Sequence, residues 1–187
     1  MIETQRTHLR ELGSGAPVTL REYQPLIGIL ETPGFYYAEF KKGAPAASEI
    51  EKFIRKYQAF QQQSPRPTFG FVAESKTDAR IIGFAEIENI DDEDGMYQGA
   101  FGVFVAPDRQ RHGFALEITN GVLKWAFQSL KLNRIKFTID PLNMPSRLLF
   151  TRNFPLVYAG LCDNPYIEQD GVLEREVYYL DRKNFRL

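Results

Sequence analysis

The chain has 187 residues, of which 43% are apolar and 25% are charged, and its formal net charge is -1. These proportions match an ordinary soluble domain with a substantial core, and they exclude disordered and fibrous proteins. A net charge this close to zero gives no broad positive field, so neither nucleic acid nor a membrane surface is an expected partner. We therefore predict one domain over residues 1–187.

Cysteine and histidine are scarce, which bears on location and on metals. The one cysteine, Cys162, permits no intramolecular disulfide and favours a reducing compartment, the cytoplasm. His8 and His112 are far apart in the sequence, so no metal site is expected. The polar N-terminus and the lack of any apolar run of about 18 residues predict neither a signal peptide nor a membrane span.

The first elements in chain order are a short alternating segment and two helical ones. Thr7 to Leu12 alternates apolar and polar residues, and Val18 to Leu30 has helical periodicity. Ser48 followed by Glu51 forms a capping box, and apolar residues then recur at helical spacing. This pattern predicts a helix from Ser48 to Gln62.

A run of strands and one helix follow. Three β-rich runs, Thr68 to Ala73, Arg80 to Asn89 and Tyr97 to Val105, are separated by polar breaks short enough for hairpins, which predicts an antiparallel meander. The period then changes to that of a helix ending near Leu130, with one apolar stripe formed by Phe114, Ile118, Val122, Trp125 and Ala126.

The last third alternates strand and helix. Arg134 to Ile139 is a predicted strand, and Asn143 is a good N-cap for a short helix with Pro145 in its first turn. Val157 to Cys162 and Leu173 to Leu180 are two final predicted strands. Antiparallel strands followed by this alternation indicate the α/β (α+β) class, with a mixed sheet that has helices on its faces.

The turn after Val105 is the most informative stretch for function. Residues 103–115 read V-F-V-A-P-D-R-Q-R-H-G-F-A, a buried strand that runs through a polar turn into a helix. The first N–H groups of a helix have no intrahelical acceptor, so they can bind a diphosphate. Gly113 would allow close approach, and Arg109, Arg111 and His112 could add charge. A tight turn without a ligand is the equally compatible alternative.

A family resemblance rests on this turn and on several other segments. Gln110 to Ala115, Q-R-H-G-F-A, resembles the Q/R-x-x-G-x-G/A acyl-CoA signature of the GNAT acetyltransferases, at the start of the same helix. Further segments resemble the ribosomal-protein N-acetyltransferase branch in order and spacing: Ile82 to Ile90, Gly102 to Pro107, Leu132 to Ile135, Asp140 to Arg147 and Tyr178 to Leu180. The resemblance runs from Thr68 to the C-terminus.

The resemblance implies a GNAT-like fold with acetyl-CoA as co-substrate. The expected sheet is mixed and mostly antiparallel, has six to seven strands, is flanked by helices, and splays between its fourth and fifth strands, here residues 97–105 and 134–139. The cofactor-binding residues that it implies are Phe104, Val105, Gln110, Arg111, His112, Gly113, Phe114, Ala115, Asn143 and Arg147. A plain helix N-cap is an equally compatible role for Asn143.

The implied reaction moves the acetyl group to a primary amine by direct attack on the thioester. A base or a chain of water molecules must take the amine proton, but the stretch Gln98 to Gly102, where relatives often have a glutamate, contains no carboxylate. The candidates that remain are Glu86, Glu88, Asp163 and Glu168, and Glu86 is preferred. For each of them, a solvated surface carboxylate is the alternative.

Two further departures from the family pattern concern the leaving thiolate and the amine site. A tyrosine often protonates the thiolate, but Phe150 occupies its position, so Ser146 is the available hydroxyl, with first-turn capping as its alternative role. Asn153-Phe154-Pro155 replaces the usual Gly-Phe. Aromatic residues could line an amine pocket: Phe35, Tyr36, Tyr37, Phe40, Tyr158 and Tyr166.

The expected acceptor is a protein N-terminus or a small amine such as an amino-acid derivative. The main alternative is a catalytically degenerate module that keeps the acyl-CoA cleft but has lost its proton-transfer groups. A nucleotide-binding protein that uses the same turn is a third reading. The sequence leaves the acyl chain preference open, and a homodimer is one compatible assembly.

Overall fold

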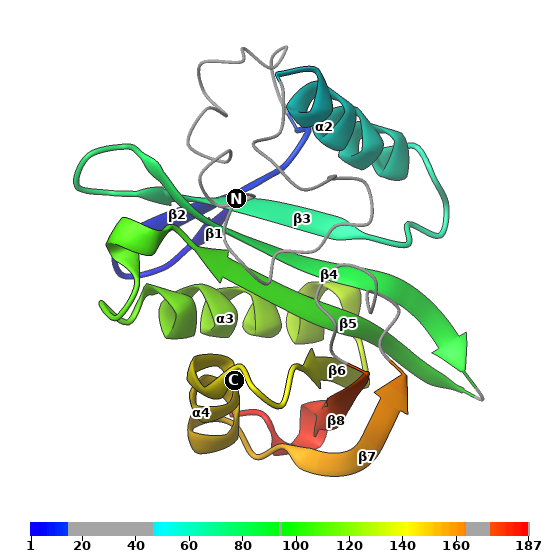
Figure 1. The fold of residues 1–187 in the computed structure, drawn as a ribbon. Coiled ribbons are helices and arrows are strands. Elements are labelled where there is room, and N and C mark those ends of the chain that lie inside the picture. Colours follow the sequence, from blue (N-terminus) through cyan, green and yellow to red (C-terminus); the bar gives the residue numbers. More distant parts are fainter. Residues whose placement is uncertain (15–46, 94, 164–172, 187) are drawn as a thin grey trace.

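The computed structural model describes residues 1–14, 47–93, 95–163 and 173–186 (Figure 1). The strands are β1 (Ile2–Glu3), β2 (Thr7–Glu11), β3 (Phe69–Ser75), β4 (Ile81–Glu93), β5 (Met96–Val105), β6 (Arg134–Ile139), β7 (Val157–Asp163) and β8 (Glu174–Asp181). The helices are α2 (Ala47–Gln61), α3 (Phe114–Trp125) and α4 (Met144–Asn153). Three short helical turns are η1 (Pro107–Arg109), η2 (Ala126–Leu130) and η3 (Arg182–Asn184).

All the strands belong to one mixed sheet. Their order is β1-β2-β3-β4-β5-β6-β8-β7, and every neighbouring pair is antiparallel except β5 and β6, which are parallel. The predicted mixed, mostly antiparallel architecture is confirmed. The described residues give eight strands where six to seven were expected, because Ile2–Glu3 pairs with β2. A two-residue strand has no alternation for a sequence pattern to reveal.

The predicted meander is confirmed as β3, β4 and β5. β4 and β5 extend further than expected, to Glu93 and back from Met96. The extension passes through a bulge between Glu88 and Asp91, where Asn89 has a φ of 51°. A bulge adds an unpaired residue and changes the alternation, which explains why the sequence pattern stops at Asn89.

The sheet opens between β5 and β6, which are the two strands that the resemblance singled out. β5 pairs with β6 only through Gln98–Ala100 and Arg134–Lys136. With β4, in contrast, β5 stays paired up to Val105. Beyond Ala100, β5 therefore has β4 on one edge and no paired strand on the other within the described residues.

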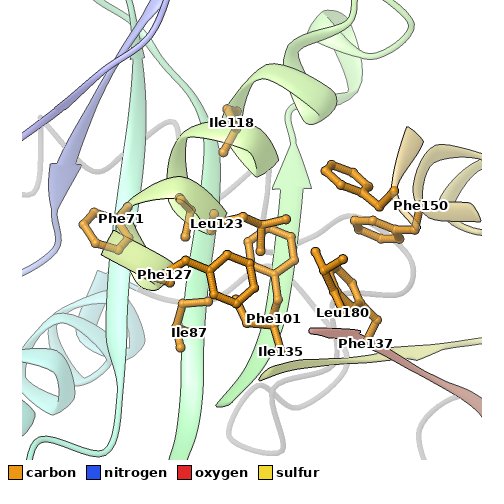
Figure 2. Packing of buried hydrophobic residues seen from close by; sticks show 14 of the residues in the cluster. Phe71, Ile87, Phe101, Ile118, Leu123, Phe127, Ile135, Phe137, Phe150 and Leu180 are labelled. Atoms are coloured by element: carbon orange, nitrogen blue, oxygen red, sulfur yellow. The ribbon is translucent and has the colours of Figure 1, made fainter. Parts of the chain in front are cut away.

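Helix α3 packs on one face of the sheet and forms the main core. Ile118, Val122 and Ala126 of the predicted stripe are fully buried, and Phe114 and Trp125 pack partly buried against the same cluster. Figure 2 shows Ile118, Leu123 and Phe127 facing strand side chains, and it shows Phe150 of α4 on the side of Phe137 and Leu180. Burial of each large apolar side chain stabilises the fold by roughly 1.5–3 kcal/mol.

Helix α2 covers the opposite face of β3 and β4 (Figure 1). Its buried residues Phe53, Ile54 and Tyr57 form a second cluster with Val72 and Phe84. The prediction of a helix from Ser48 to Gln62 is confirmed to within one residue at each end. The side chain of Ser48, which the capping box would use, falls outside what the structure describes.

Several sequence predictions fall outside the described residues. They are the helical periodicity from Val18 to Leu30, the base candidate Glu168, and the aromatic residues Phe35, Tyr36, Tyr37, Phe40 and Tyr166. Within the described ranges, no helix combines the length and the apolar character needed to cross a lipid bilayer.

Candidate acyl-CoA site

The turn between β5 and α3 exposes the start of the helix. Arg111 and Gly113 both have left-handed backbone conformations, with φ of 63° and 81°. The first hydrogen bond of the helix joins the Glu117 amide to the Gly113 carbonyl at 3.1 Å, and no side chain caps the helix at Gly113. The amides of Phe114 and Ala115 are therefore left without an intrahelical acceptor, as an anion site requires.

Side chains of the turn divide into paired and exposed groups. Gln110 donates from Nε2 to the Val105 carbonyl at 3.1 Å, which ties the turn to the end of β5. Arg109 pairs with Asp78 at 2.5 Å, so its charge is already neutralised. Arg111 and His112 are exposed, and His112 Nδ1 lies 2.7 Å from the Gln110 carbonyl. Of the cationic side chains in the turn, Arg111 is thus better placed than Arg109 to meet an anion.

Arg6, a residue that the sequence did not suggest, contacts the same turn from the segment before β2. Its Nη1 donates to the His112 carbonyl at 2.9 Å and its Nε to Glu117 at 2.7 Å. Burial raises the pKa of Glu117, but hydrogen bonds from Thr4 and Arg6 outweigh this effect, so the net shift is downward. Arg6 is 111 residues from Glu117, and no local pattern marks such a contact.

The free edge of β5 is defined by the alternation of its main-chain groups. The Ala106 amide donates to the Ile82 carbonyl at 2.9 Å, which places Ile82 and Ala106 in a hydrogen-bonded pair. By alternation, the main chain of Phe104 is directed to β4, and that of Val103 and Val105 is directed to the opening. The opening therefore presents the amide and carbonyl of Val103 and the amide of Val105, whose carbonyl accepts from Gln110.

The N-terminus of α4 has the predicted cap. Asn143 accepts from the Ser146 amide through Oδ1 at 3.1 Å, so the N-cap role of Asn143 is confirmed. Asn143 is exposed and Ser146 is partly buried. Phe150, at the position where relatives often have tyrosine, is buried at 6% exposure and packs on Phe101 and Phe137. Ser146 is thus the hydroxyl that the first turn of α4 offers.

Arg147, one turn into α4, is held by β8. Its Nε lies 3.0 Å from Oε2 of Glu176, and the Tyr178 hydroxyl donates to the same oxygen at 3.0 Å. Burial and the hydrogen bond to Glu176 raise the pKa of Tyr178. The ion pair joins α4 to the sheet, and Arg147 would meet a cofactor only with Glu176 beside it. Its role in cofactor binding stays a prediction.

Glu86 is a buried carboxylate on the face of β4 that α2 covers. It is 4% exposed, and the Tyr57 hydroxyl donates to its Oε2 at 2.5 Å. Its cross-strand neighbours on either side are Gly70 and Gly102. A Cβ at Gly102 would lie 3.3 Å from Glu86 Oε1, and one at Gly70 would overlap the Tyr57 ring. The carboxylate therefore fills space over β5 where a residue larger than Gly102 would project its side chain.

Glu88, the second acid on that face, is partly buried. Desolvation raises its pKa, and the positive charge of Lys56 opposes this shift without cancelling it. The other candidate base on the described residues, Asp163, is exposed at the end of β7. Tyr158 is 54% exposed, with its ring centroid 5.3 Å from that of Tyr178. Among the candidate bases on the described residues, Glu86 alone is both buried and held by a hydrogen bond that fixes its orientation.

The raised pKa of Glu88 predicts a pH-dependent gain in stability on substitution. A carboxyl whose folded pKa exceeds its unfolded value stabilises the fold below the unfolded pKa and loses that contribution as pH rises through the folded one. We therefore expect Glu88→Gln to raise the free energy of unfolding at pH 7, and the gain to vanish below the ordinary value of 4.5. Urea unfolding at both pH values measures it.

Glu51→Gln is the control for this experiment, because Glu51 is solvent-exposed and, within the described part of the chain, its ion pair is a 4.0 Å contact to Arg55. Its loss should change the stability little at either pH. A Glu88→Gln variant that is destabilised at pH 7 would contradict the expectation.

The family comparison agrees with the resemblance seen in the sequence. The model of the acetyltransferase (GNAT) domain matches residues 16–153, which is more than half of the chain. A search of curated proteins found no match.

Solved structures of similar fold extend over nearly the whole chain. A candidate ribosomal-protein-serine acetyltransferase from Vibrio cholerae is 21% identical, with a TM-score of 0.74 and 96% of each chain covered. A chimera of the spermidine N-acetyltransferase SpeG from Vibrio cholerae with hSSAT is 18% identical, with a TM-score of 0.73 and coverage of 96% and 97%. An acetyltransferase of the GNAT family from Bacillus anthracis is 15% identical, with a TM-score of 0.71 and coverage of 97% and 98%. At identities this low, the structural similarity shows a common fold alone.

Proposed function

Because the chain belongs to the GNAT acetyltransferase family and is an acyltransferase, we propose that it moves an acetyl group from acetyl-CoA to a primary amine. The observation that carries the proposal is the uncapped N-terminus of α3. It follows β5, a strand with a free edge among the described residues, after a turn of residues 106–113, the phosphate turn. Together they offer amides for a diphosphate and a main-chain ladder for the amide groups of a pantetheine arm.

The donor would be held from two sides of the opening. The main-chain amides of Arg111, His112, Gly113, Phe114 and Ala115 would bind the diphosphate, while Gln110, whose amide donates to the Pro107 carbonyl at 3.4 Å, would hold the turn in place. Val103 and Val105 would pair with the pantetheine amides, while Phe104, whose main chain is directed to β4, would contribute its partly buried side chain. On the α4 side, Asn143 and Arg147 complete the proposed set of cofactor-binding residues.

Transfer would proceed by direct attack of the neutral amine. Its nitrogen forms a bond to the thioester carbonyl carbon, the carbon–sulfur bond breaks, and the amine proton passes to a base. We assign that base to Glu86, because its carboxylate lies over β5 beside Gly102 in place of an acid on that strand. CoA would leave as the thiolate, and Ser146 would hydrogen-bond the leaving sulfur directly or hold a water that does.

A second candidate function has specific support in the sequence. No carboxylate occurs in residues 98–102, and Phe150 replaces the usual tyrosine. A module that binds acyl-CoA without turnover would keep the phosphate turn and tolerate both changes. The buried Tyr57–Glu86 pair favours the enzyme. Burying a carboxylate has a desolvation cost, and a module without turnover would not need a buried base.

The acceptor belongs to the proposal as well. Two of the similar structures are of proteins named as a spermidine N-acetyltransferase and a ribosomal-protein-serine acetyltransferase, which supports both a small amine and a protein N-terminus as proposed acceptor classes. A single domain over residues 1–187 and a cytoplasmic location, inferred from the one cysteine, belong to the same proposal.

The test measures turnover and binding together. Release of CoA from acetyl-CoA is followed with polyamines, amino-acid derivatives and N-terminal peptides, while calorimetry gives the Kd values of acetyl-CoA and ATP. We expect acetyl-CoA to bind and at least one amine class to support release. Binding without release for every class would favour the module, and ATP binding as tight as that of acetyl-CoA would favour a nucleotide-binding protein.

A further inference from the structure

The segment that joins β1 to β2 reaches the phosphate turn. Thr4 and Arg6 lie in this segment, and both contact Glu117 in the first turn of α3. Thr4 Oγ1, the Arg6 amide and Arg6 Nε donate to the Glu117 carboxylate at 2.5, 2.6 and 2.7 Å. The side chain of Glu117 is 12% exposed. One nearly buried carboxylate thus fixes the segment against the helix.

The guanidinium of Arg6 is oriented by three independent contacts. Besides Glu117, it donates through Nη1 to the His112 carbonyl at 2.9 Å. Its Cζ lies 4.3 Å from the centroid of the Phe114 ring, a cation–π contact. These partners lie on the two sides of Gly113, so they hold the guanidinium across the start of α3.

The third nitrogen of Arg6 remains available. Within the described ranges no acceptor hydrogen-bonds to Nη2, and the side chain is 42% exposed. A Cβ built on Gly113 would lie 3.4 Å from this nitrogen. Nη2 therefore lies beside the residue whose neighbouring amides form the proposed diphosphate site. A guanidinium is well suited to phosphate oxygens, because its donors are fixed in one plane.

The charge of Glu117 gives Arg6 a second effect. A carboxylate in the first turn of a helix is favoured by the helix dipole, but it repels an anion bound at the same helix end. The ion pair at 2.7 Å neutralises this carboxylate. Without Arg6, the phosphate turn would face both a loosened loop and an unpaired negative charge.

We propose that Arg6 is a further cofactor-binding residue, which positions the phosphate turn through His112 and Glu117 and donates from Nη2 to the diphosphate of the acyl carrier. This inference rests on the proposed function. It adds a ligand-binding residue from the N-terminal segment to a site otherwise built from β5, α3 and α4.

The experiment compares Arg6→Gln and Arg6→Lys with Arg10→Gln in the full chain. Arg10 forms an ion pair with Glu74 at 2.7 Å and lies at the other end of β2, so its variant controls for the loss of a surface ion pair. For Arg6→Gln we expect the Kd and KM of acetyl-CoA to rise about tenfold to a hundredfold. The saturating kcat and the KM of the amine should stay at wild-type values. Arg6→Lys, which keeps the charge without the planar donors, should lie in between.

The outcomes separate this inference from the proposed function. Wild-type protein that fails to bind acetyl-CoA in calorimetry would overturn both. Wild-type protein that binds, with Arg6→Gln affinity within twofold of it, would overturn only the role of Arg6. A fall in kcat and in unfolding midpoint with unchanged affinity would reduce Arg6 to a structural residue. Calorimetry keeps the test valid for a module without turnover.

Discussion

Replacing Gly113 with glutamate is expected to abolish acetyl-CoA binding. The new Cβ would lie 3.4 Å from Arg6 Nη2, so the carboxylate would occupy the space beside the amides of α3 that the diphosphate needs. Two like charges about 4 Å apart near a protein surface repel by about 4 kcal/mol, or on the order of a thousandfold in affinity. Calorimetry with acetyl-CoA measures the loss.

Two alanine variants separate charge from backbone strain. Gly113 has a φ of 81° and Gly95 a φ of 77°, and a Cβ at Gly95 would meet nothing within 4 Å. Alanine at either site imposes the same left-handed strain, roughly 1–2 kcal/mol. Both variants should lose similar stability, and Gly95→Ala should bind acetyl-CoA like the wild type. A Gly113→Glu variant that keeps its affinity within a few-fold would contradict the proposed location of the diphosphate.

The sequence was a good guide to the elements whose patterns are local. Residues 134–139 were predicted as a strand with the bounds that the structure has, and the stripe from Phe114 to Ala126 faces the core from α3 and the start of η2. Side-chain periodicity is set by neighbours three or four residues away in a helix and two in a strand, so it can be read without the fold. The strand Ile2–Glu3 was missed because two residues show no period.

The site was predictable where it is contiguous in the chain. The phosphate turn follows one strand and opens one helix, so its spacing is visible in the sequence. The contacts of Arg6 with Glu117 and of Tyr57 with Glu86 join residues 111 and 29 positions apart. Alternation placed Glu86 on a face of β4, but its burial depends on α2 and on the glycines beside it. Such pairings arise from packing and leave no local signal.

Replacing Glu86 with glutamine is expected to lower kcat by about a hundredfold to ten-thousandfold, the usual contribution of a general base. Glutamine keeps the shape of the side chain and an oxygen that can accept from Tyr57, so the slot beside Gly102 stays filled. The amide cannot take the amine proton. Steady-state kinetics with the best acceptor should show a lower kcat and an unchanged KM for acetyl-CoA.

Two further variants decide whether this loss reports proton transfer at Glu86. Glu88→Gln changes the next acid on the same face of β4, and it should keep most of kcat; if it loses as much as Glu86→Gln, the base is Glu88. Ser146→Ala should lower kcat by less, because water can replace a hydroxyl that hydrogen-bonds the leaving sulfur. Near wild-type kcat in Glu86→Gln would remove Glu86 from the mechanism, since no folding defect can explain retained activity.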